Sequence, residues 1–151
     1  LALAREIEQA LLRADSRVRL LDTRPAEQYA GQAIWTPHGN LFLPSGQSWI
    51  ALADGRMMQG GHIPGAAHLH ASRLLNPVDW TYLPLESIQA LARGAGLEPE
   101  QRVITGSRVG HLGLLGLFAL HLAGYRDVAL YDASWEEWGT DPALPVERER
   151  G

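Results

Sequence analysis

Short strand-forming runs alternate with helical segments along this chain, and this alternation constrains the fold more than any other feature. The runs with the composition of buried strands are VRLLD at 18–22, RVIT at 102–105 and DVALYD at 127–132. Apolar side chains recur at helical spacing in residues 3–13, 84–97 and 110–124. This order predicts an α/β domain in which helices flank a central, mostly parallel sheet.

The connections between these segments differ in length. Residues 24–31 predict a short helix that follows a proline and ends at Gly31. Residues 31–61 are rich in Gly, Pro, Ser and His, and a connection of that length is usually functional or peripheral. A turn at Pro64-Gly65 and a short strand are expected within residues 61–69.

The chain of 151 residues fits one domain, so we expect a single domain over residues 1–151. The sequence has no initiator methionine and starts inside a helical pattern, which favours a fragment of a longer protein.

Composition excludes several classes of function. The net charge is −4, and the 13 basic residues are all arginines scattered along the chain, so we expect no nucleic-acid partner. There is no membrane-length apolar run and no signal-peptide core, so we expect no membrane contact and a cytoplasmic location. The absence of cysteine excludes disulfides, cysteine-ligated zinc and thiol chemistry by the chain as written.

Polar side chains follow three of the predicted strands. Asp22 ends one strand, Ser107 follows the next and Asp132 follows a third. Because binding sites in open α/β sheets lie at the carboxyl ends of the strands, these residues predict the rim of a site.

Four segments together resemble the rhodanese family. They are LLDTRP at 20–25, GHIPGAAHL at 61–69, the strand-loop-helix segment at 103–122 and LYDASWEEWG at 130–139. Rhodaneses move a sulfane sulfur from thiosulfate or 3-mercaptopyruvate to a thiophilic acceptor. The resemblance covers about residues 5–146, in family order, and is strongest to the second, catalytic domain of tandem enzymes. It therefore implies a rhodanese-like domain, and it adds a second rhodanese domain as a candidate partner.

The resemblance also assigns roles to the residues of the loop after RVIT. Ser107 falls on the catalytic cysteine of the family, Gly106 on the preceding aromatic residue and Leu112 on a threonine or arginine. In this family the loop backbone curls so that its N–H groups and the following helix stabilise a thiolate, a persulfide or an anion. The residues that would form this cradle are Arg108, Val109, Gly110, His111, Leu112 and Gly113.

Serine at the cysteine position changes the expected chemistry. A cradle of this kind can produce a thiolate near neutral pH, whereas a serine hydroxyl ionises several units higher and needs a strong base. Oxygen also cannot carry a transferable sulfur as a persulfide does. We therefore predict that this chain does not turn over, either as a naturally silent relative or because the cysteine was replaced by engineering. The alternative is a silent binding or regulatory module that keeps the cradle for an anion.

The remaining site residues are also assigned by the resemblance. Arg24 matches an arginine that binds the anionic donor, and Asp22 beside it is expected to brace the loop. Ala30 stands where mercaptopyruvate enzymes have a second arginine, which favours thiosulfate as the donor. Two roles remain open for Arg108, a substrate contact and a solvated charge. His62 is expected to bridge loops. No cofactor and no metal are expected.

Other interpretations remain less favoured. Ser107 with His111 could form a serine nucleophile and base, but the order Gly-Ser-x-x-Gly lacks the nucleophile-elbow pattern. A phosphatase-like cradle would need a cysteine and one more loop residue. His68 and His70 could ligate a metal, although spacing places no third ligand. His121 is expected to be a packing residue of its apolar helix.

Overall fold

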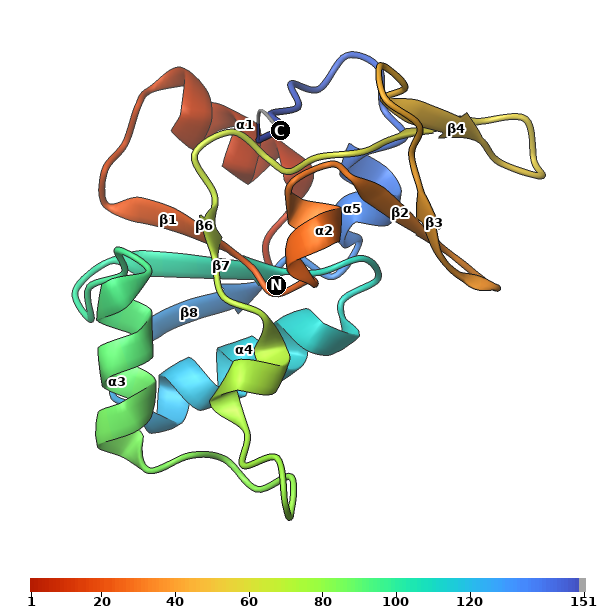
Figure 1. The fold of residues 1–151 in the computed structure, drawn as a ribbon. Helices are drawn as coiled ribbons and strands as arrows, with labels where there is room; N and C mark the ends of the chain where they lie inside the picture. Colours follow the sequence, from red (N-terminus) through yellow and green to blue (C-terminus); the bar gives the residue numbers. More distant parts are fainter. Residues whose placement is uncertain (150–151) are drawn as a thin grey trace.

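A computed structural model describes residues 1–149 and shows an α/β fold built on a central parallel sheet (Figure 1). The sheet has four strands in the order β6-β1-β7-β8, and every neighbouring pair is parallel. The strands are β1 (Val18–Asp22), β6 (Ala67–His68), β7 (Arg102–Gly106) and β8 (Asp127–Leu130). The predicted parallel sheet is therefore confirmed, with β1 and β7 at its centre.

Alternate strand residues build a separate core on each face of the sheet. Leu20 and Ile104 belong to one core, which they share with α1 (Ala4–Leu12) and α5 (Ser134–Trp138). Leu21, which follows Leu20, and Val103, which precedes Ile104, belong to the other core. The helices there are α3 (Leu85–Gly94), α4 (His111–Leu122) and the short 3₁₀ turn η1 (Ala71–Leu74). Figure 1 shows these two layers of helices on opposite sides of the sheet.

Residues 31–61 are more regular than the composition of this segment indicated. After the short helix α2 (Ala26–Tyr29), they form two antiparallel hairpins outside the central sheet. The hairpin strands are β2 (Ala33–Thr36), β3 (Gly39–Phe42), β4 (Trp49–Ala51) and β5 (Met57–Gln59). Because these strands are only three or four residues long, their period-two pattern is too short to stand out from the surrounding turn residues.

The expectation for His121 is wrong. Its side chain is exposed, because it lies on the outward stripe of α4 with Leu114, Phe118 and Leu122. The helix is apolar on nearly all sides, so its sequence does not reveal which side faces solvent. Among residues 1–149, no helix combines the length and apolarity needed to cross a membrane.

Candidate active site

Ser107 lies directly after β7, at the carboxyl edge of the sheet, and is 5% exposed. Its Oγ accepts a hydrogen bond of 2.9 Å from the backbone N–H of Gly110. Gly110 has a φ of +90°, and a Cβ there would lie 2.6 Å from the Asp132 Oδ1 atom. A glycine is thus required to close the loop so tightly around position 107.

The backbone of this loop is turned so that its carbonyls face α5. The carbonyl oxygens of Ser107 and Arg108 accept hydrogen bonds of 3.0 Å from the N–H groups of Trp135 and Glu136. In a trans peptide the N–H points opposite to the C=O, so the next two N–H groups, of Arg108 and Val109, point away from α5. Among residues 1–149, these two N–H groups have no protein acceptor. The loop therefore has the donors that an anion or a sulfur atom carried at position 107 needs.

Ser134 anchors this loop and was not identified from the sequence as a site residue. Its Oγ accepts a hydrogen bond of 3.0 Å from the Ser107 N–H and donates one of 2.7 Å to the Tyr131 carbonyl. Ser134 is 1% exposed and has a φ of +53°. Its hydroxyl thus satisfies two buried backbone groups from a conformation that is costly for a residue with a Cβ.

Arg24 and Asp22 form a buried ion pair at the same edge. Asp22 accepts from Arg24 Nε and from Arg24 Nη2, the latter at 2.6 Å, and Nη2 also donates to the Gly61 carbonyl. The guanidinium lies over the ring of Trp135, 4.5 Å from the ring centroid. Asp22 therefore orients Arg24, and among residues 1–149 only Nη1 of the guanidinium has no hydrogen-bond acceptor.

Arg108 is largely buried and lies against Glu136 and Trp35. Its side chain is 19% exposed and forms an ion pair of 2.8 Å with Glu136, which also pairs with Arg56. The guanidinium of Arg108 lies 4.7 Å from the ring centroid of Trp35, on β2. Nothing in the sequence connected Trp35 with the loop, because the contact depends on how the first hairpin folds back.

His62 and His68 each stack on Tyr29 and lie close to a backbone carbonyl. His62 stacks on Tyr29 at 3.7 Å, and its Nδ1 atom lies 2.7 Å from the Tyr29 carbonyl, so it joins the loop after β5 to the end of α2. His68 stacks on the same tyrosine, and its Nε2 atom lies 2.7 Å from the Arg24 carbonyl. Burial, followed by the nearby His68, lowers the pKa of His70. Residues 1–149 contain no group of three potential metal ligands.

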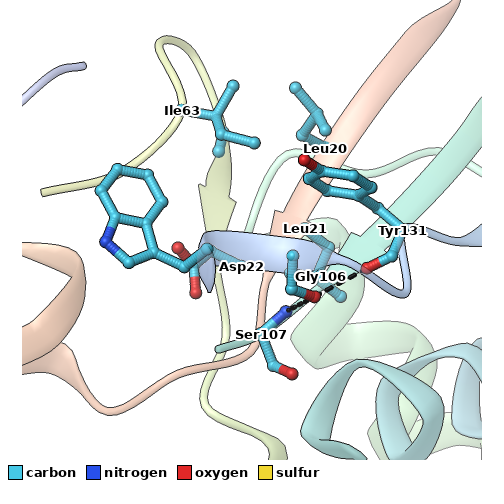
Figure 2. A pocket seen from close by; sticks show the side chains of 10 residues that line it. Leu20, Leu21, Asp22, Ile63, Gly106, Ser107 and Tyr131 are labelled. Atoms are coloured by element: carbon cyan, nitrogen blue, oxygen red, sulfur yellow. Dashed lines mark hydrogen bonds between the residues drawn. The ribbon is translucent and has the colours of Figure 1, made fainter. Parts of the chain in front are cut away.

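Two cavities meet at Ser107, and they differ greatly in size. The smaller one, of about 20 Å³, lies between the loop and the sheet, where Asp22, Gly106 and Tyr131 surround it (Figure 2). It can hold about one water molecule and is too small for a substrate. The larger one, of about 470 Å³, is the size of a ligand pocket. Its lining residues are Arg24, Pro25, Gln28, Trp35, Ser107, Arg108, Val109, His111 and Leu112.

The site does not have the bond that a serine hydrolase needs. Ser107 Oγ is bonded to the Gly110 N–H, and no hydrogen bond joins it to His111 within residues 1–149. His111 is exposed at the start of α4. The arrangement instead concentrates backbone donors and two guanidinium groups around one buried side chain.

Comparison with known proteins identifies the family of the chain. A Haloferax volcanii protein, named provisionally as a thiosulfate sulfurtransferase, is 31% identical over 144 residues, which are 95% of this chain and 44% of that protein. The sulfur carrier protein TtuD of Thermus thermophilus is 26% identical over 141 residues, covering 93% of this chain and 45% of that protein. The chain thus spans less than half the length of these relatives.

The solved structures agree with the sequence comparison. The crystal structure of the Tum1 protein from Saccharomyces cerevisiae superposes with a TM-score of 0.73 at 26% identity, over 100% of this chain and 47% of that one. Residues 4–141 match the family described as the Rhodanese-like domain. On this match, and on its fold, the chain belongs to the rhodanese family of sulfurtransferase domains.

Proposed function

We propose that this domain is built to transfer sulfane sulfur from thiosulfate through a nucleophile at position 107, and that Ser107 makes the chain inactive. The observation that carries the proposal is the position of Ser107. It is buried at the end of β7, beside backbone N–H groups that have no acceptor within residues 1–149, and it lines a pocket that also contains Arg24 and Arg108. The relatives named for thiosulfate sulfur transfer and sulfur carriage support the same reaction.

With a cysteine at this position, the residues around it have defined roles. The thiolate attacks the outer sulfur of thiosulfate, the sulfur–sulfur bond breaks, and sulfite leaves with the bonding electron pair. The loop N–H groups and the start of α4 stabilise the thiolate and the resulting persulfide. The Arg24 guanidinium binds the donor through Nη1, and Arg108 limits the other side of the pocket.

The serine hydroxyl cannot take the same first step. No carboxylate or imidazole is hydrogen-bonded to Ser107 Oγ within residues 1–149, so no base is in place to remove its proton. A hydroxyl without such a base stays protonated at neutral pH and does not attack sulfur.

The test is thiosulfate:cyanide sulfurtransferase activity of the unaltered chain and of Ser107→Cys. We expect thiocyanate only from Ser107→Cys, together with a mass increase of one sulfur atom after incubation with thiosulfate. The matched control is Ser72→Cys, which adds a thiol at an exposed serine outside the loop and should stay inactive. Turnover by the unaltered chain would refute the proposal, and inactivity of Ser107→Cys would leave the silent binding module as the function.

The organisation of the whole protein is part of this proposal. Since the chain spans less than half of the relatives, we propose that residues 1–151 are one rhodanese-like domain of a tandem protein. The second rhodanese domain would then be the partner of this one.

A further inference from the structure

The pocket beside Ser107 is much larger than the two substrates of the test reaction need. Thiosulfate and cyanide are small ions, whereas a pocket of about 470 Å³ matches sites that bind organic molecules. One reactant of the native reaction should therefore be larger than either ion. This inference rests on the proposed function and concerns the acceptor of the sulfur.

The surface of the pocket is largely apolar. Trp35, Val109 and Leu112 line it together with Pro25, while Ser107 lies within the same pocket. Trp35 is 40% exposed and Val109 is 43% exposed, so both keep apolar surface that the domain itself does not cover. An apolar group in contact with this surface would be favoured, because the contact removes it from water.

The charges of the pocket are already compensated. Arg24 is paired with Asp22 and Arg108 with Glu136, so the two guanidinium groups give the pocket little net positive charge beyond the Nη1 donor of Arg24. A thiol with a neutral apolar body meets no electrostatic penalty at such a site, whereas a highly charged acceptor gains little.

Trp35 has a defined neighbour beside the pocket. The Arg108 guanidinium lies 4.7 Å from the centroid of the indole ring, and Trp35 is still 40% exposed. An indole that already makes such a contact can stack on an aromatic ring with a smaller loss of its own freedom.

We propose that the sulfur acceptor of this domain is a thiol with an apolar, ring-sized group, and that Trp35 determines this specificity. In the transfer step, the acceptor thiolate attacks the outer sulfur of the persulfide on the cysteine of Ser107→Cys. A new sulfur–sulfur bond forms on the acceptor, and the bond to the cysteine sulfur breaks. The cysteine leaves as the thiolate, ready for the next donor.

The test compares two acceptors in the Ser107→Cys background. After loading with thiosulfate, the rate of transfer to benzyl mercaptan is divided by the rate of transfer to cyanide. Replacing Trp35 by alanine should lower this ratio about tenfold, as the loss of one aromatic contact and its burial would. Trp35→Phe should restore most of the ratio, because it keeps a ring on β2.

The matched control is Trp49→Ala, on the second hairpin. Trp49 is 43% exposed, close to the value for Trp35, but it does not line the pocket. Its replacement should leave the ratio within about twofold, as expected of a surface change. An equal ratio in Trp35→Ala and Trp49→Ala would overturn the inference.

A binding experiment on the unaltered chain separates this inference from the proposed function. Titration with benzyl mercaptan should shift the indole N–H resonance of Trp35, which is assigned by its absence from Trp35→Phe, and Trp35→Ala should weaken binding. If binding depends on Trp35 but Ser107→Cys takes no sulfur from thiosulfate, the proposed function fails and the pocket specificity stands. If sulfur is transferred but neither binding nor the ratio depends on Trp35, the inference fails alone.

Discussion

The hydroxyl of Ser134 should stabilise the whole domain through the loop at Ser107. In Ser134→Ala, the buried Ser107 N–H and the Tyr131 carbonyl lose the partners that lie at 3.0 Å and 2.7 Å in the native structure. A buried backbone group left without a partner costs about 1–3 kcal/mol. Two such groups, with partial relief from water in the adjacent cavity of about 20 Å³, suggest a loss of about 2–4 kcal/mol.

The backbone conformation of Ser134 allows the hydrogen-bond term to be separated from strain. The φ of +53° is costly for alanine and serine alike, but not for glycine. Ser134→Gly loses the same two hydrogen bonds but relieves about 1 kcal/mol of strain, so it should destabilise less than Ser134→Ala. Denaturant unfolding with linear extrapolation measures all three free energies on one scale.

The control for Ser134 is Ser72→Ala. Ser72 is exposed, and within residues 1–149 its hydroxyl is hydrogen-bonded only to the nearby His70 ring, so its loss should change stability by less than about 0.5 kcal/mol. The reasoning is refuted if Ser134→Ala is as mild as Ser72→Ala, or if glycine at 134 is worse than alanine. In the first case water replaces the hydroxyl fully, and in the second the strain is not real.

Two further predictions concern titratable groups that are buried or partly buried. Asp22→Asn should destabilise the domain by about 3–5 kcal/mol in denaturant unfolding, because it leaves the Arg24 guanidinium, 3% exposed, without its counterion. A loss below about 1 kcal/mol, the usual value for an exposed pair, would contradict this. Burial, followed by the charge of Asp22, raises the pKa of Tyr29 from 10.0 to about 12, so the folded state holds this proton more tightly than the unfolded state. The stability lost in Tyr29→Phe should therefore be constant below pH 10 and shrink between pH 10 and about 12, and a pH-independent difference would show that Tyr29 titrates normally.

The central sheet was predictable because its strands are short, buried and bounded by clear signals. The segment VRLLD forms β1, and RVIT lies within β7. The helix α3 lies within residues 84–97, where apolar residues recur at helical spacing. Burial on both faces favours continuous apolar runs, which are visible without knowledge of the partners. The hairpins at residues 31–61 were missed because each of their strands covers at most two repeats of the period-two pattern.

At the site, the sequence indicated which residues meet but not what each of them contacts. Asp22 and Ser107 do lie at neighbouring strand ends, as the order of strands implied. The contacts of Trp35 with Arg108 and of Ser134 with Ser107 join residues that are far apart in the chain. Such contacts follow from the packing of the loop against β2 and α5, and no local pattern encodes them.

The three Asp-x-Arg pairs of the chain have the same local hydrogen bond, but the sequence does not predict which of them is buried. Asp15 with Arg17, Asp22 with Arg24 and Asp54 with Arg56 share the same spacing, and in each the arginine N–H donates to the aspartate at 3.0 Å. The local hydrogen bonds are thus encoded three times in the same way. Only the second pair follows a central strand, where Trp135 and the Gly61 carbonyl enclose the guanidinium, which removes it from solvent. In the other two pairs the arginine side chains are 86% and 48% exposed, and exposed pairs of this kind contribute little to stability.

Asp54→Asn is therefore the matched control for Asp22→Asn, because it makes the same chemical change in the same local geometry. If the two changes cost the same, the Asp22–Arg24 pair acts only as a local turn and does not fix the arginine at the pocket.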